Sequence, residues 1–427
     1  MDKKLLDDCF LSDRDRLRHD EALAILRERV RPVVGQERVA VADALGRVLA
    51  QTVLAPRDVP AHTNAAVDGY SFAAADYVGG APTRLDLLGR AAAGHPYLGC
   101  AQPATAARIF TGAVLPPGHD TVAMQEDVEV ELEAGRAVVR IPTGLRPQAN
   151  VRRAGEDVKA GVRVLEAGTV LRPQDLAALA SLGCAEVSCF ARLQVATLSS
   201  GDEIVRPGTA LGPGQVYDAN TPMLRGLIAA TGASAADLGV LPDDQQVVRR
   251  RLAQAAQGYE VIITSGGASR GEEDHMVAAL DALGKRHLWQ LAIKPGRPMT
   301  FGQIGDCVVV GLPGNPVAVF VCFLLYVWPL LRCLGGAPWP APRRFFLPAN
   351  FEVPARKVGR REFWRATLVA GPNGALAVAK FARDGSGLIS GLRAADGLIE
   401  IPEEVATVKA GDAVAFIPFT EFGIAAR

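Results

Sequence analysis

Hydrophobic positions at helical spacing open the chain, and a similar pattern returns after residue 150. In the segment DEALAILRERV, Leu23, Leu26 and Val30 recur at spacings of three and four, which predicts an amphipathic helix. Short helices and strands follow on both sides of a long intervening segment. We therefore interpret residues 1–55 and 150–190 as the two halves of one discontinuous α+β module.

The intervening segment, residues 56–149, has the pattern of short strands. Strands are predicted over residues 85–88 and 108–111, and the alternating arms VEVELE and AVVRI flank a turn at Ala134-Gly135. This pattern predicts an inserted β-rich domain.

From residue 191 onward, apolar strands alternate with helices. The predicted strands span residues 193–198, 236–241, 260–264, 288–293 and 307–310, and the predicted helices begin at Pro222 (capped by Thr221), after a cap at Asp243, at Glu272 and at Pro316. Strands that are apolar almost throughout are typical of parallel strands buried on both faces. Residues 191–338 are therefore predicted to form a doubly wound α/β domain.

The most apolar run, Val317–Leu331, is predicted to be a buried helix. It is shorter than the roughly 20 residues that a bilayer span needs, and Pro329 interrupts it near its end. Beyond a Pro- and Gly-rich linker, alternating strands and the turn GPNG predict a small all-β domain over residues 339–427. The predicted fold class is α/β multidomain, with an α+β module and two β-rich domains.

Composition narrows the classes of partner. The 427 residues correspond to about three domains at roughly 150 residues each. Lys+Arg and Asp+Glu number 46 each, and this neutrality argues against nucleic acid or an anionic membrane as the main partner. Seven scattered cysteines without a CxxC pair favour reduced thiols, and the N-terminal segment has no apolar signal-peptide core. We expect a soluble, cytoplasmic protein.

Acidic and glycine-rich segments follow the predicted strands of the α/β domain. SSGDE places Glu203 after one strand, LPDD places Asp243 after the next, and glycines occur in TSGGASRGEED and GLPGNP. Ligands of doubly wound sheets bind at the carboxyl ends of the strands, where glycine amides can hold phosphate and carboxylates can hold Mg²⁺. A plain turn, a helix cap at Asp243 and acids in a first helical turn are the alternative interpretations.

Two cations on IKPGRP, Lys294 and Arg297, lie on a stretch stiffened by proline and glycine. They can bind an anion and stabilise the charge that develops as it is transferred. The alternative interpretation is a solvated basic loop. In the last domain, Arg365 and Ser386 are a candidate donor pair for an oxyanion, and surface positions are the alternative. No CxxC pair of a zinc site occurs.

The ordered motifs NAAVDGY, FTGAVLPPG, MQED, RRAGEDV, SSGDE, YDAN, SGGASRGEED, LAIKPGRP and GLPGNP resemble those of one family. It is the molybdopterin molybdenumtransferase (MoeA) family, which includes the E domain of gephyrin. The resemblance covers about residues 20–420. It implies an elongated four-domain subunit that dimerises, takes adenylated molybdopterin and molybdate, hydrolyses the adenylate with Mg²⁺, and releases AMP.

The resemblance also implies site residues. The acidic and polar active-site set would be Asp68, Thr111, Asp157, Glu203, Asp243 and Asp274, with Asp243 and Asp274 as the metal ligands. Substrate binding is expected from Ser265, Gly266, Gly267, Lys294, Arg297, Gly314, Asn315, Arg365 and Ser386, of which Lys294, Arg365 and Ser386 would bind molybdate. In a homodimer, Asp68 and Thr111 would face the sheet edge of the other subunit, so the site would be composite.

Four positions depart from the family pattern. Ala65 and Ala318 stand where Ser is common, and Gln290 and Arg297 stand where Lys is common. The absence of a fused adenylyltransferase domain implies that a separate protein supplies the adenylated substrate, with molybdenum enzymes or their chaperones downstream. Two rival functions share the fold: an adenylyltransferase that makes the adenylate, and a non-catalytic scaffold, which the changes at Gln290 and Ala318 would allow.

Overall fold

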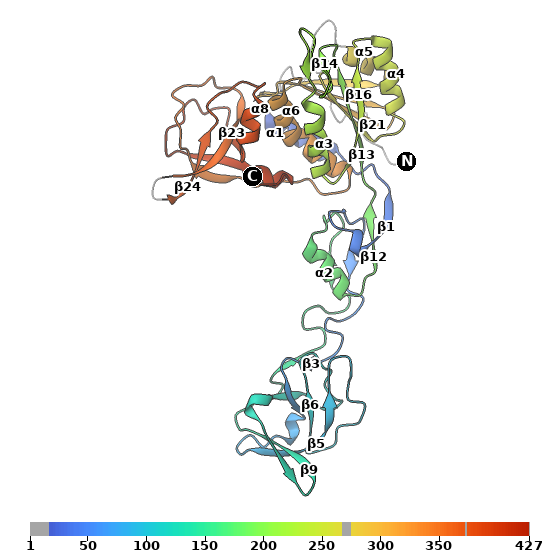
Figure 1. Cartoon of the computed structure of the whole chain (residues 1–427), viewed down its shortest axis with the longest axis vertical. Helices are drawn as coiled ribbons and strands as arrows, with labels where there is room; N and C mark the ends of the chain where they lie inside the picture. The colour runs from blue at the N-terminus through green and yellow to red at the C-terminus, as the bar shows by residue number, and fades with distance from the viewer. Residues whose placement is uncertain (1–16, 267–274, 372–373, 427) are drawn as a thin grey trace.

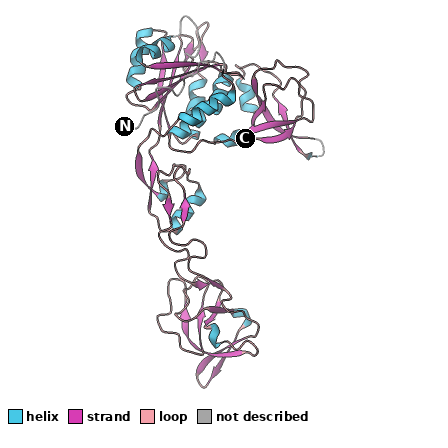
Figure 2. Cartoon of the chain, turned by 180° about the vertical axis from the view of Figure 1, so that it is seen from behind, coloured by secondary structure: helices cyan, strands magenta, loops and turns pink. Residues whose placement is uncertain are grey.

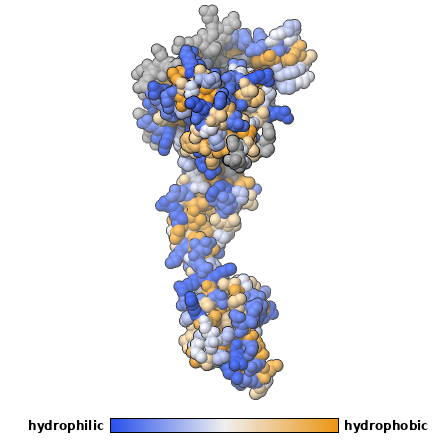
Figure 3. Space-filling view, turned by 90° about the vertical axis from the view of Figure 1, so that its left-hand side faces the viewer, coloured by the Kyte–Doolittle hydropathy of each residue, from blue (hydrophilic) through white to orange (hydrophobic). Residues whose placement is uncertain are grey.

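The protein is an elongated molecule. A computed structural model describes residues 17–266, 275–371 and 374–426. Two domains lie side by side at one end, a small module forms a neck, and a β-rich domain lies at the far end (Figure 1). On the face shown in Figure 3, hydrophilic and hydrophobic residues are interspersed over all of these parts.

The neck module is built from two distant stretches of sequence. Residue pairs such as Val39 and Val187 join its antiparallel strands, and its core includes Leu49, Leu171 and Leu179. Its elements are β1 (Gln36–Ala40), η1 (Val41–Asp43), β2 (Val53–Leu54), β11 (Arg163–Leu165), α2 (Pro173–Ser181) and β12 (Glu186–Phe190), with β1 paired to β12 and β2 to β11.

The distal domain is formed by the chain between these two halves. Its described residues form a six-stranded sheet in the order β7-β4-β6-β5-β9-β8. Figure 2 shows that strands dominate this end of the molecule. The elements are β3 (Asn64–Ala65), β4 (Gly69–Phe72), η2 (Ala74–Asp76), β5 (Thr83–Ala91), β6 (Thr105–Ile109), β7 (Thr121–Met124), η3 (Gln125–Asp127), β8 (Glu129–Glu133), β9 (Arg136–Ile141) and β10 (Val151–Arg152).

The α/β domain contains a second six-stranded sheet, in the order β16-β13-β17-β21-β20-β18. The first four strands are parallel, whereas β20 runs antiparallel to both of its neighbours. Its strands are β13 (Gln194–Ser200), β14 (Ile204–Val205), β15 (Val216–Tyr217), β16 (Ser234–Leu241), β17 (Val261–Ser265), β18 (Lys285–Gln290), β20 (Pro298–Ile304) and β21 (Cys307–Leu312), and β14 pairs with β15 outside the main sheet.

Helices cover both faces of this sheet, because successive strand residues point to opposite sides. Val195 joins a core with α1, α3 and the helix that follows β21, while its neighbour Ala196 joins a core with α4 and α5. The helices are α1 (His19–Arg29), α3 (Asn220–Ala230), α4 (Gln245–Ala255) and α5 (His275–Leu283). The prediction of a doubly wound α/β domain within a multidomain protein is confirmed. α1, grouped with the neck module by its sequence position, packs against the α/β domain instead.

The predicted buried helix extends from Pro316 to Leu334. It comprises α6 (Pro316–Cys322), a π-helical turn η4 (Phe323–Val327) and α7 (Trp328–Leu334). Its length and hydropathy would suit a membrane span, but its most apolar stretch is 94% buried inside the protein, as expected of a core helix. Pro329 lies in the first turn of α7, directly after the π turn, where a missing N–H is tolerated. The helix therefore continues past the proline.

The C-terminal domain is a β-sheet in the order β19-β23-β25-β26-β22, with β24 paired to β23. The strand β19 comes from the α/β segment and pairs in parallel with β23, so the chain enters this sheet between β18 and β20. The elements are β19 (Ile293–Lys294), β22 (Phe345–Pro348), β23 (Arg361–Ala370), β24 (Leu376–Lys380), α8 (Ile389–Ala394), β25 (Gly397–Ile401), β26 (Ala413–Pro418) and η6 (Phe419–Phe422).

Two predicted helix caps are wrong. Thr221 lies inside α3, and the buried Asp218 carboxylate accepts hydrogen bonds from its backbone N–H at 3.0 Å and its hydroxyl at 2.8 Å. Asp244, not Asp243, caps α4 by accepting from the backbone N–H groups of Gln246 and Val247. In each case a neighbouring Asp has the shorter reach to the first-turn amides. Asp243 is therefore left available for another partner.

Candidate functional site

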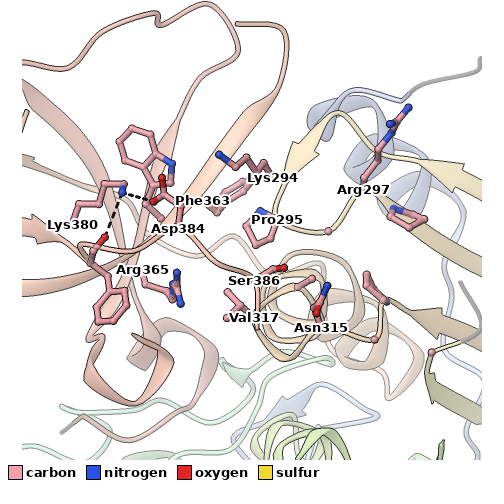
Figure 4. A pocket seen from close by; sticks show the side chains of 18 residues that line it. Lys294, Pro295, Arg297, Asn315, Val317, Phe363, Arg365, Lys380, Asp384 and Ser386 are labelled. Carbon is pink, nitrogen blue, oxygen red and sulfur yellow. Dashed lines mark hydrogen bonds and ion pairs between the residues drawn. The ribbon is translucent and has the colours of Figure 1, made fainter. Parts of the chain in front are cut away.

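A cavity of about 500 Å³ lies where the carboxyl edge of the α/β sheet meets the C-terminal domain (Figure 4). Both domains line it, with glycine and proline loops on one side and aromatic and basic side chains on the other. The predicted substrate-binding residues on its lining are Gly266, Lys294, Arg297, Gly314, Asn315, Arg365 and Ser386.

Lys294 reaches the cavity because β19 joins the C-terminal sheet. Its Nζ lies 3.5 Å from Oε2 of Glu362, a carboxylate only 4% exposed. Nε1 of Trp364 donates to the same carboxylate at 2.8 Å, and Nε of the buried Arg356 lies 3.6 Å from its other oxygen. A buried carboxylate with three such partners fixes the direction of the Lys294 ammonium.

Arg365 is held from three sides. Nη1 donates to the carbonyl of Leu388 at 2.9 Å, Nη2 donates to the carbonyl of Arg383 at 2.6 Å, and the guanidinium lies 4.9 Å from the centre of the Phe381 ring. Burial lowers the pKa of Arg365, and the charge of Asp384 opposes this shift. A guanidinium held in this way is preorganised for an anion.

The two glycine loops of the α/β domain are tied together by Asn220. Its Nδ2 donates to Oγ of Ser265 at 2.6 Å and to the carbonyl of Gly314 at 2.7 Å. The N–H of Gly266 donates to Leu312, at the end of the neighbouring strand β21. Ser265 itself is not on the cavity lining, and Gly267 lies outside the described residues.

The loop that carries Arg297 lies against the long buried helix. A Cβ on Gly296, whose φ is +105°, would come within 2.2 Å of Sγ of Cys322, so only glycine allows this approach. In Figure 4, the Arg297 guanidinium extends away from Arg365 and Ser386. The N–H of Val317, in the first turn of α6, donates to the carbonyl of Ser386 at 3.0 Å, which joins the two domains at the cavity.

The predicted carboxylates lie farther along the sheet edge, outside the cavity lining. The N–H of Asp243 donates to Oδ1 of Asp202 at 3.1 Å, and the N–H of Asp202 lies 3.4 Å from Oδ2 of Asp243. The carboxylate of Glu203 folds back over Gly201, where a Cβ would come within 2.4 Å of Oε2. These exposed oxygen donors suit Mg²⁺, which takes one or two carboxylates and completes its shell with water and phosphate. Within the described ranges, no three acidic, His or Cys residues form a cluster that could hold a metal, and Asp274 lies outside those ranges.

Asp68 and Thr111 form a pair in the distal domain. The backbone N–H and the hydroxyl of Thr111 donate to the same Asp68 oxygen at 2.8 and 2.7 Å, and these bonds lower the pKa of Asp68. Asp157 is exposed where the distal domain joins the neck. Within one chain, the distal domain, which contains Asp68 and Thr111, lies at the opposite end of the molecule from the cavity (Figure 1).

Several cavity residues were not singled out by sequence reasoning. They include Phe363 and Trp364 on β23, Lys380 at the end of β24, Phe381 directly after it, and Asp384 in the following loop. The motif RDGSG, which drew attention to Ser386, contains Asp384 as well and was the available signal. Among the family departures, Ala318 lines the cavity, Ala65 is buried in the distal domain and Gln290 lies at the end of β18.

Family models match three successive parts of the chain. The MoeA N-terminal region (domain I and II) matches residues 17–183, a probable molybdopterin binding domain matches residues 196–333, and the MoeA C-terminal region (domain IV) matches residues 347–419. The matches follow the order of the motifs along the chain.

Relatives and solved structures match almost the whole chain. A molybdopterin molybdenumtransferase of Haemophilus influenzae is 36% identical, covering 94% of this chain and 98% of the relative, and a molybdopterin molybdenumtransferase 2 of Mycobacterium tuberculosis is 34% identical, covering 92% and 96%. A structure of the molybdopterin biosynthesis MoeA protein of Pyrococcus horikoshii matches with a TM-score of 0.78 and 28% identity over 95% of this chain and 100% of that one. The fold and its cavity define an enzyme of the MoeA class. The chain belongs to the molybdopterin molybdenumtransferase family, as its motifs predict.

Proposed function

We propose that this chain is a transferase of molybdenum cofactor biosynthesis that inserts molybdate into adenylated molybdopterin, hydrolyses the adenylate and releases AMP. The observation that carries the proposal is the basic cavity at the carboxyl edge of the α/β sheet. Lys294, Arg297 and Arg365 contribute basic side chains to its lining, and molybdate is a tetrahedral dianion. Family membership supplies the substrate class.

The glycine loops and carboxylates account for the other half of the substrate. Gly314 has no side chain, and an added Cβ there would meet no atom within 4 Å, so a phosphate oxygen can approach the backbone of this loop. Mg²⁺, held by Asp243 together with Asp274, would neutralise the phosphoric anhydride and so make AMP a better leaving group. Glu203 follows Asp202, whose backbone N–H lies 3.4 Å from Oδ2 of Asp243, so Glu203 lies on the same sheet edge as Asp243.

Asp68 and Thr111 belong to the distal domain, which lies at the other end of the molecule from the cavity within one chain (Figure 1), and Asp157 lies where that domain joins the neck. We therefore propose a homodimer in which the distal domain of one subunit reaches the sheet edge of the other, and in which Asp68 and Thr111 complete a composite site. We also propose that the protein acts in the cytoplasm, receives its adenylated substrate from a separate adenylyltransferase, and passes the cofactor to molybdenum enzymes or their chaperones.

The reaction is tested by incubating the purified protein with adenylated molybdopterin, Mg²⁺ and molybdate. AMP release that requires molybdate, with molybdenum retained on the pterin, is expected. ATP-dependent adenylation of molybdopterin would instead identify an adenylyltransferase, and no turnover would identify a scaffold. Asp243→Asn should abolish Mg²⁺-dependent AMP release, whereas its neighbour Asp244→Asn is the matched control, since Asn caps a helix equally well.

The composite site is tested by mixing two inactive variants, Asp68→Asn and Asp243→Asn. After subunit exchange, mixed dimers should regain activity, because one of their two sites then contains both native carboxylates; about one quarter of all sites would be intact in a random mixture. Activity that stays absent after verified exchange would show that each site is built within one subunit.

A further inference from the structure

The cavity lining contains an ion pair to which the proposed function assigns no role. Nζ of Lys380 forms a close ion pair with Oδ1 of Asp384 and donates to the carbonyl of Phe381 at 3.3 Å (Figure 4). Both residues line the cavity, on the wall that the C-terminal domain contributes. The paired charges therefore face the space proposed for the oxyanion.

The charge balance of the cavity depends on this pair. Of the described residues on its lining, Lys294, Arg297, Arg365 and Lys380 are cationic, and Asp384 alone is anionic. The charge of Asp384 also raises the pKa of Arg365, which burial lowers. A bound oxyanion must therefore meet this carboxylate as well as the cations.

The two partners differ in how firmly they are held. The side chain of Lys380 is 14% exposed, and its ammonium lies 5.4 Å from the centre of the Trp364 ring. Trp364 is fixed in turn by Glu362, the same carboxylate that orients Lys294. Asp384, by contrast, is 60% exposed and lies in the loop after β24. Asp384 can turn into solvent at small cost, whereas Lys380 stays in place.

We propose that Lys380 is an additional oxyanion-binding residue and that Asp384 is its built-in competitor. The carboxylate occupies Lys380 when the cavity is empty and is displaced into water when the oxyanion binds. The incoming dianion replaces one negative charge at Lys380 with a stronger one, so the cation is never left unpaired in a largely buried position. Return of Asp384 to Lys380 favours departure of the anion. This inference rests on the proposed function for the identity of the anion, and deepens it.

Binding of molybdate alone to the full-length protein, measured by calorimetry, tests this role. Lys380→Met should weaken molybdate binding by about tenfold, the loss expected for a charged hydrogen bond, and Lys380→Arg should restore most of it. Asp384→Asn should tighten binding by about threefold, as expected when one partner of a half-exposed ion pair is removed. Glu404→Gln, an exposed carboxylate of the same domain outside the cavity, is the control and should change nothing.

The double variant separates competition from simple repulsion. If Asp384 competes for Lys380, Asp384→Asn should tighten binding with Lys380 present and have little effect in the Lys380→Met background. Equal tightening in both backgrounds would overturn the inference, and so would native affinity in Lys380→Met. Absence of molybdate binding by the native protein would also overturn it. If the two residues are coupled in molybdate binding but the native protein releases no AMP, the proposed function is refuted and this inference still stands.

Discussion

Gly391, inside α8, should be required for tight oxyanion binding although it does not line the cavity. A Cβ at this position would lie 2.6 Å from Nη1 of Arg365 and 2.8 Å from the Phe381 ring, closer than unbonded atoms approach. Its φ lies outside the left-handed region, so alanine is compatible with the backbone. Gly391→Ala should therefore act by pushing the Arg365 guanidinium, and the Phe381 ring that it lies against, out of position.

The size of the effect follows from the bonds that are lost. Nη1 of Arg365 cannot stay 2.9 Å from the carbonyl of Leu388 once the methyl group is present. A hydrogen bond of a charged group contributes about 1.5–3 kcal/mol, whereas alanine in a helix gains about 1 kcal/mol over glycine. The fold should therefore survive. Molybdate binding should weaken by about ten- to a hundredfold, since about 1.4 kcal/mol corresponds to each factor of ten.

The assay is the dependence of AMP release on molybdate concentration, together with calorimetry of molybdate alone. The matched control is Gly387→Ala in the preceding loop, where an added Cβ meets no atom within 4 Å. The KM for molybdate should rise in Gly391→Ala and not in Gly387→Ala. Native molybdate affinity in Gly391→Ala would refute the role assigned to the held Arg365.

Three further predictions concern other positions. Arg365→Lys should lose at least tenfold in molybdate affinity, because an ammonium cannot bond both carbonyls and an anion at once; titration with molybdate checks this. Ala318→Ser should tighten molybdate binding by about threefold by adding a hydroxyl to the cavity wall, and unchanged affinity in the same titration would contradict it. Burial and the charge of Arg361 lower the pKa of His19 from 6.5 to about 3, so the unfolded chain binds a proton that the folded chain does not between these values. Stability should fall as the pH falls through that range, by up to about 1.4 kcal/mol per pH unit, and His19→Phe should flatten the dependence in urea unfolding at pH 5 and pH 7.

The α/β domain could be predicted because its signals are local. Strands such as Val261–Ser265 are apolar on both faces, and helices begin close to Asp and Asn residues. The caps of α3 and α4 were misplaced by a few residues, since Asp218 and Asp244 compete with their neighbours for the same amides. The strand β20 was missed because its register in the sheet depends on β21, a long-range partner.

The cavity could be predicted only in part. IKPGRP and RDGSG marked Lys294 and Ser386 because cations, glycines and prolines stand out in sequence. Nothing local shows that β19 leaves one sheet to pair with another, which brings Lys294 beside the C-terminal domain. Lys380 ends the strand β24, whose other four residues are apolar, so its place in the cavity follows only from how the domains pack. The grouping of Asp68 with the sheet edge needs a second subunit and stays a prediction.

The central claim is that the cavity between the α/β sheet edge and the C-terminal domain binds the oxyanion. Anomalous diffraction from crystals of the protein soaked in tungstate, a heavier tetrahedral analogue of molybdate, tests it most directly. A peak between Lys294, Arg365 and Ser386 is predicted, and it should disappear in Arg365→Ala. A peak elsewhere on the protein, with this cavity empty at saturating tungstate, would contradict the claim.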